Sequence, residues 1–236
     1  MAQKKVLIDG IGEVTLQKRR GTKNLRISIG AGGDVRVGMP TWVPYSAGVA
    51  FARQKLDWIL THRQKRPQPQ LLAGMRVGKY HRVVHLPSTL ETTTVRVAEN
   101  QILVKTNIPV ENALVQKKIC KAAENALNAE AAALLPGRVD EMAKQYSYTY
   151  SKVVIKKLTA RWGSCSGQGV ITLSYYLMQL PWPLIDYVIL HELAHTKQLN
   201  HSSAFWGQLS TTHKDYKTAR KQIKNYYPAI IPSDMP

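Results

Sequence analysis

A stretch near the end of the chain, YVILHELAHTKQLNHSSAFW at residues 187–206, places three histidines and a glutamate in an otherwise apolar segment. The segment begins with the pattern of an apolar helix, in which positions i and i+4 lie one above the other on the same face. His191 and His195 have this spacing, and Glu192 borders the same face. Two imidazoles beside a carboxylate, in the pattern HExxH, predict a metal site.

A catalytic zinc ion typically has three protein ligands and one open position, so a third ligand is needed. His201 is the candidate, although it lies too far beyond His195 to share the same helical face. We expect the helix to end near Leu199 and Asn200, because asparagine tolerates a left-handed turn. The chain could then fold back and bring His201 to the metal.

These residues predict hydrolytic chemistry. Bound zinc lowers the pKa of its water molecule towards neutrality and polarises the group under attack. Glu192 stands next to a ligand, so we expect it to act as the general base that takes the proton and passes it to the leaving group.

The elements that must position these residues alternate between strand and helix patterns, which predicts an α+β fold. Residues 1–108 are expected to form a β-rich, basic region with one helix at 44–63. Residues 109–236 are expected to form the mainly helical region that carries the histidines. We find no internal repeat that would suggest a different organisation.

Within the second region, three features frame the candidate site. A helix beginning near Pro109 is expected to be interrupted at Pro136 and Gly137. A turn at residues 166–169 predicts a hairpin, and the segment Pro181-Trp182-Pro183 is expected to open the histidine helix.

Charge is the unusual feature of the composition. The chain has 33 Lys and Arg against 15 Asp and Glu, a formal net charge of +18. Such a field attracts anionic substrates or partners, nucleic acid among them. The basic run at residues 18–26 is open to two interpretations, a phosphate-binding edge or a solvated hairpin turn.

The rest of the composition predicts a cytoplasmic protein that is not inserted in a membrane. The chain has no apolar run of membrane-spanning length, and we expect no signal peptide at its start. Its two cysteines are too few for a disulfide framework. No feature of the sequence indicates an oligomeric state.

The motif and its surroundings together resemble a known family. The run ARWGSCSGQGVITLS at residues 160–174, a proline, and then YVILHELAHTKQLNHSSAFW are similar to the YgjP-like metallopeptidase domain, which is related to the WLM and SprT-like families. The resemblance is specific over about residues 160–206 and looser over most of the chain. It implies a zincin-like α+β fold with His191, His195 and His201 on zinc and Glu192 as the base.

Two residues of the first run leave alternatives open. Arg161 could bind a substrate carboxylate or phosphate, or it could pair with an acidic group or a helix end. Cys165 could be a nucleophile or a ligand, but a small buried residue is the favoured interpretation.

Three function hypotheses follow. A zinc-dependent peptidase is favoured by the motif and the family resemblance. A metal-dependent hydrolase of nucleoside triphosphates or another phosphate-containing small molecule, with Mg²⁺ or Mn²⁺ bridging the substrate, is the alternative that the positive charge suggests. A basic nucleic-acid-binding protein with a structural metal ranks last, because structural zinc normally has four protein ligands.

Overall fold

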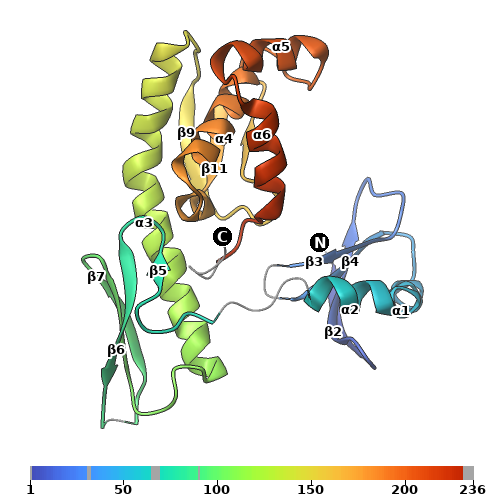
Figure 1. Ribbon diagram of the computed structural model, residues 1–236. Coiled ribbons are helices and arrows are strands. Elements are labelled where there is room, and N and C mark those ends of the chain that lie inside the picture. The colour runs from blue at the N-terminus through green and yellow to red at the C-terminus, as the bar shows by residue number, and fades with distance from the viewer. Residues whose placement is uncertain (1, 31–32, 65–69, 90, 231–236) are drawn as a thin grey trace. The chain divides into compact units, whose positions relative to one another are not determined.

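The computed structural model describes residues 2–30, 33–64, 70–89 and 91–230, and the chain divides into two units at Gln68 (Figure 1). Each unit has its own sheet and hydrophobic core. The α+β class is confirmed. Among the described helices, none combines the length and apolarity needed to cross a bilayer.

The first unit is a four-stranded mixed sheet with two helices. Its strands lie in the order β1-β2-β4-β3, and only the β2–β4 pairing is parallel. Alternate residues of β2 and β4 are buried, as a half-buried strand requires. The strands are β1 (Gln3–Ile8), β2 (Gly12–Arg19), β3 (Arg26–Ile29) and β4 (Val35–Pro40).

Two helices stand where the sequence predicted one helix at 44–63. They are α1 (Tyr45–Gln54) and α2 (Leu56–Gln64), separated at Lys55. The Lys55 N–H donates to both Phe51 O and Ala52 O, at 3.2 Å each, which closes the first helix. Ala52 and Ile59, one from each helix, are both fully buried in the core of this unit.

The second unit begins with a sheet in the order β5-β6-β8-β7, in which β6 and β8 are parallel. Its strands are β5 (Arg76–Val77), β6 (His81–Pro87), β7 (Thr94–Ala98) and β8 (Gln101–Thr106). Val83, Ile102 and Val104 of this sheet share one core with the helix that follows. Because of that shared core, the division between units falls at Gln68 and not at the expected 108/109.

That helix, α3 (Ala113–Gln145), is about 50 Å long and runs past both sheets of the second unit (Figure 1). Asn112 caps it by accepting from Leu114 N at 2.9 Å, so it begins after Pro109. The predicted interruption at Pro136 is wrong, since the helix continues through it. Fully buried Leu135 and Val139 flank the proline, and their packing offsets its cost of about 3 kcal/mol.

The second sheet of this unit has the order β10-β11-β9, with an antiparallel β10–β11 hairpin as predicted and a parallel β11–β9 pair. The strands are β9 (Lys152–Lys156), β10 (Gly163–Cys165) and β11 (Val170–Ser174). A 3₁₀ helix, η1 (Tyr175–Gln179), follows β11. The remaining helices are α4 (Trp182–Ala194), α5 (Ser203–Thr212) and α6 (Tyr216–Gln222), and a second 3₁₀ turn, η2 (Ile223–Asn225), comes last.

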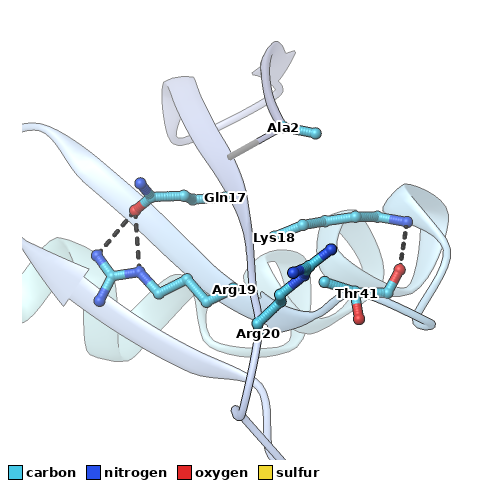
Figure 2. A pocket seen from close by; sticks show the side chains of 6 residues that line it. All are labelled: Ala2, Gln17, Lys18, Arg19, Arg20 and Thr41. Atoms are coloured by element: carbon cyan, nitrogen blue, oxygen red, sulfur yellow. Dashed lines mark hydrogen bonds between the residues drawn. The ribbon is translucent and has the colours of Figure 1, made fainter.

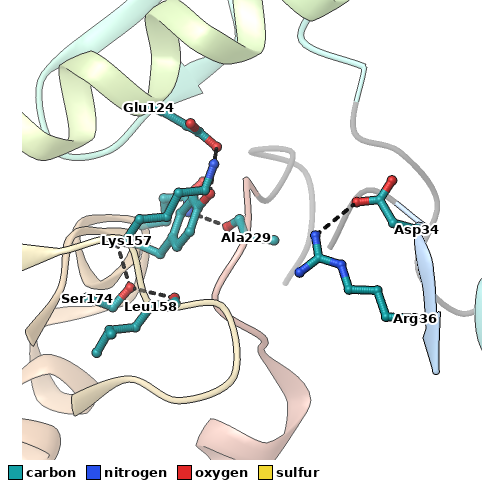
Figure 3. A network of polar contacts seen from close by, with 9 residues as sticks. Asp34, Arg36, Glu124, Lys157, Leu158, Ser174 and Ala229 are labelled. Carbon is teal, nitrogen blue, oxygen red and sulfur yellow. Dashed lines mark hydrogen bonds and ion pairs between the residues drawn. The ribbon is translucent and has the colours of Figure 1, made fainter. Parts of the chain in front are cut away.

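A polar network fixes the end of β11 against α3 (Figure 3). Glu124 of α3 accepts from Lys157 Nζ at 2.5 Å and from the Tyr176 hydroxyl at 2.8 Å. Ser174 donates to Leu158 O at 3.0 Å and accepts from Tyr176 N at 3.4 Å. These contacts set the path of the chain just before it enters α4.

A buried carboxylate holds the turn between β5 and β6 on α3. Glu130 is 4% exposed and accepts from the backbone N–H of Lys79, Tyr80 and His81 and from His81 Nδ1, at 2.6 to 3.3 Å. Gly78 makes the approach possible, because a Cβ there would lie 2.2 Å from Glu130 Oε2. One side chain therefore satisfies most of the polar groups of this turn.

Replacing Glu130 by Ala should lower the free energy of unfolding of the second unit by about 3 kcal/mol or more, because the turn's N–H groups and His81 lose their acceptor in a buried place. Urea unfolding followed by circular dichroism measures the loss. As a control, Glu13→Ala removes a carboxylate from an exposed ion pair with Lys5 and should leave the midpoint unchanged. Equal unfolding midpoints for both variants would show that Glu130 does not stabilise the turn between β5 and β6.

Candidate metal centre

Helix α4 carries the first two histidines and Glu192. It begins after Pro181, and Pro183 fits its first turn, where a backbone N–H has no helical partner. It ends at Ala194, earlier than the predicted end near Leu199 and Asn200. His195 is the C-cap, and its N–H still donates to His191 O at 3.3 Å, so the i and i+4 relation holds.

The chain returns to the helix without the left-handed residue that was predicted. Asn200 does not have a positive φ. Instead, Gln198 N donates to Ala194 O at 3.0 Å, and the Asn200 side chain accepts from Ser202 N at 3.3 Å. These two contacts reverse the chain and bring His201 back over the end of α4.

The three histidines converge through the same ring atom. His201 Nε2 lies 3.0 Å from His191 Nε2 and 3.2 Å from His195 Nε2. Three nitrogens that each bind one tetrahedral zinc ion at about 2.0–2.1 Å stand about 3.3 Å apart. The three side chains are also the one group of metal-binding residues of this kind among the described residues. The residues present therefore fit a zinc ion.

Hydrogen bonding and burial set the state of these rings. His195 Nδ1 lies 2.9 Å from Gln198 O, and a carbonyl can only accept, so Nδ1 carries the proton and Nε2 has a free lone pair. Burial, with the neighbouring His195, His201 and Arg220, lowers the pKa of His191 to about 3. Neutral imidazoles are the form that binds a metal.

Aromatic rings pack directly against the histidine rings. Phe205 of α5 is fully buried, and its ring centroid lies 4.5 to 4.9 Å from those of all three histidines. Trp206 stacks on His201 at 5.6 Å and on Tyr216 at 5.6 Å. Phe205 and Trp206 therefore pack against the histidine rings.

Glu192 lies against strand β10. The residue is 5% exposed, and a Cβ on Gly163 would stand 2.8 Å from both its Cγ and its Oε1. Cys165 donates a backbone hydrogen bond to the Glu192 carboxylate, while Oε2 has no partner among the described residues. The glycine of the WGSC run is thus the residue that lets a strand backbone approach the carboxylate.

The environment of Glu192 favours its protonated form in the absence of a cation. Burial raises the pKa of Glu192 to about 8, while Arg161 and the Cys165 N–H oppose the rise. A divalent cation at the adjacent histidines would act in the same direction as Arg161 and favour the carboxylate. The form that can accept a proton is therefore the one that a bound cation would favour.

The sequence left the roles of Arg161 and Cys165 open. In the structure Arg161 lies near Glu192, and the surroundings of Cys165 favour a structural role. Arg161 is exposed and makes no hydrogen bond or ion pair with another described residue, but its charge acts on Glu192. Burial raises the pKa of the half-buried Cys165 thiol, which donates to Ser166 O at 3.4 Å. Cys165 is not part of the histidine group.

The sequence did not reveal a second arginine at the site. The Arg220 guanidinium of α6 lies 4.5 Å from the Trp206 ring centroid, and its charge acts on His191 and His201. Like Arg161, it is exposed and pairs with no carboxylate among the described residues. No local spacing in the sequence links Arg220 to the histidines.

Comparisons with known proteins show which family the chain is similar to. A family model described as the YgjP-like metallopeptidase domain matches residues 23–226. The chain is similar to the metallopeptidase zymogen abylysin of Pyrococcus abyssi, with 26% identity over 36% of this chain and 87% of that one, at a TM-score of 0.33. The chain is also similar to the metallopeptidase zymogen jannalysin of Methanocaldococcus jannaschii, with 25% identity over 36% of this chain and 89% of that one, at a TM-score of 0.33. No curated protein matches the chain.

Replacing His201 by Ala should lower the affinity for zinc by more than about 100-fold, since loss of a ligand exceeds the usual effect of losing a ligand's hydrogen-bond partner. The zinc affinity is measured from the metal content after dialysis and by competition with a chromogenic chelator. His213→Ala is the matched control, because His213 packs edge-on against Tyr187 at 5.8 Å and lies outside the histidine group. Unchanged affinity in His201→Ala would remove this residue from the ligand set.

Replacing Gly163 by Ala should leave zinc bound but lower turnover about 100-fold, because the new Cβ displaces the Glu192 carboxylate. Gly167→Ala in the same hairpin is the control, since a Cβ there would meet nothing within 4 Å. Metal content and steady-state rates are measured side by side. If Gly163→Ala were as active as Gly167→Ala, the close approach of β10 to the Glu192 carboxylate would not matter for turnover.

Proposed function

Because the chain belongs to the YgjP-like family of metallopeptidase domains, we propose that it is a zinc-dependent peptidase with a zincin-like site. In this proposal His191, His195 and His201 hold the metal and Glu192 is the general base. The observation that supports it most is the convergence of three imidazole Nε2 atoms beside a buried, only partly hydrogen-bonded carboxylate.

The metal would supply one element of the chemistry: a lowered pKa for an attacking water molecule and polarisation of the carbonyl group. Glu192 would then accept the proton from that water and donate it to the leaving nitrogen. Its hydrogen bond from the Cys165 N–H and its contact with Gly163 would keep it oriented for both transfers. Burial would keep bulk water from competing for the same proton.

Strand β10 supports a peptide as the substrate. It lies at the end of its sheet and pairs with β11 alone among the described strands. In this proposal its other edge receives an extended peptide through the main-chain groups that remain there, since the Cys165 N–H on that edge already donates to Glu192. Since Gly163 and Cys165 of β10 contact Glu192, a peptide on that edge would run past the general base.

A second candidate is supported by the two unpaired guanidinium groups at the site. Arg161 acts on Glu192, and Arg220 acts on His191 and His201, so two positive charges that pair with no carboxylate among the described residues act at the candidate site. Such groups would suit an anionic substrate, and the same activated water could attack phosphorus. The alternative is a metal-dependent hydrolase of nucleoside triphosphates or a similar phosphate compound, with Mg²⁺ or Mn²⁺ bridging the substrate.

Glu192→Gln should keep zinc and the fold but lower turnover by about 100-fold to 10,000-fold, because the amide cannot accept the proton. The zinc-loaded wild type and this variant are each incubated with a peptide library and, separately, with mixed nucleoside triphosphates and Mg²⁺. Cleaved peptides are identified by mass spectrometry, and released phosphate and pyrophosphate are quantified.

The two arms separate the candidates. Peptide cleavage that disappears in Glu192→Gln supports the peptidase, whereas phosphate release that disappears in the variant replaces it with the second candidate. A variant as active as the wild type in either arm would show that Glu192 is not the base of that reaction.

A further inference from the structure

A basic hollow lies in the first unit, at the end of strand β2. It has a volume of about 990 Å³, and it is lined by Ala2, Gln17, Lys18, Arg19, Arg20 and Thr41 (Figure 2). That volume is within the range of small-molecule sites and would admit a nucleotide. The unit around it has 13 Lys and Arg against four Asp and Glu within residues 1–68.

The strand places two cations on one side of the hollow. Side chains alternate along a strand, so Lys18 and Arg20 extend together towards Thr41 while Arg19 extends the other way (Figure 2). Lys18 Nζ donates to Thr41 O at 3.0 Å, and Arg19 donates to Gln17 Oε1 at 2.8 and 3.2 Å. These contacts orient the cations without neutralising them.

Among the residues that the structure describes, no acidic side chain lines the hollow. Two of the four acids of the unit form ion pairs elsewhere, Glu13 with Lys5 at 2.8 Å and Asp34 with Arg36 at 3.7 Å. Lys18 and Arg20 thus lie on one side of the hollow with no carboxylate among the described lining residues. Like charges held this way are stabilised by an anion that bridges them.

Aromatic side chains accompany the charges. The ring of Tyr45 lies 4.8 Å from Lys18 Nζ and 6.0 Å from Lys4 Nζ. Trp42 follows the lining residue Thr41 directly and is 77% exposed, the largest exposed aromatic surface of the unit. A large exposed indole beside a basic hollow needs a reason, because burial in the core would be worth several kcal/mol.

We propose that this hollow binds single-stranded nucleic acid, with Lys18 and Arg20 on backbone phosphates and Trp42 stacked on an unpaired base. Basic grooves with stacking aromatics are how proteins bind single strands without reading their sequence. A duplex does not offer the faces of its bases, and a concave basic site fits a flexible strand better than a flat membrane. The inference does not depend on the proposed peptidase activity.

The test uses the full chain and fluorescein-labelled oligo-dT of about 12 nucleotides, with binding followed by fluorescence anisotropy at several NaCl concentrations. Lys18→Gln/Arg20→Gln should reduce the slope of log K against log[salt] by about 1.4, or about 0.7 for each lost phosphate contact. Trp42→Ala should weaken binding about fivefold or more and leave the slope unchanged.

Two controls accompany these variants. Lys5→Gln/Arg36→Gln removes the same charge from ion-paired positions and should bind almost as the wild type does. Glu192→Gln should bind oligo-dT normally, which separates this surface from the candidate metal centre. Circular dichroism confirms that each variant is folded.

Four outcomes would overturn the proposal. They are no binding of oligo-dT at low salt, a duplex of equal length bound as tightly, phosphatidylserine vesicles bound with the same losses in the same variants, and an equal loss in Lys5→Gln/Arg36→Gln. The third outcome would identify an anionic membrane surface, and the last would assign any affinity to net charge alone.

Discussion

Three convergent imidazole rings, with His201 Nε2 at 3.0 Å from His191 Nε2 and 3.2 Å from His195 Nε2, are the constraint on which the candidate metal centre depends. Lone pairs at this distance repel unless a proton or a cation lies between them. Protonation is opposed by burial, which lowers the pKa of His191 to about 3. The fold thus holds an arrangement that suits a metal ion better than a proton, and in the proposed site metal binding and folding of this region would be thermodynamically coupled.

The surrounding elements maintain this arrangement by packing against it. Phe205 contacts all three histidine rings, Trp206 stacks on His201, and Gly163 brings strand β10 onto Glu192. Behind them, the hydrogen bonds of Glu124 fix the chain where it enters α4. The candidate chemistry therefore rests on rigid helix and strand positions, while the two unpaired arginines remain exposed, as substrate contacts should be.

The sequence predicted what depends on local spacing and missed what depends on tertiary contacts. The i and i+4 relation of His191 and His195 follows from helix geometry alone, and the hairpin before them from its turn residues. Pro136 was expected to break a helix because the energetic cost of a proline inside a helix can be read from the sequence. The tertiary packing that offsets this cost cannot be read from it. Arg220 and the contact of Gly163 with Glu192 join distant segments, for which one sequence offers no signal.

The length of α3 has a consequence for how the second unit can be divided. One face of this helix packs on β7 and β8 near its start and on β9 and α4 farther along, within a single core. A fragment beginning at residue 109 would keep every candidate metal ligand but expose the apolar surface that β6 and β8 cover. A piece that keeps this core whole begins near residue 69, so the sheet of β5 to β8, which contributes none of the candidate metal ligands, belongs to the same structural unit as the histidines.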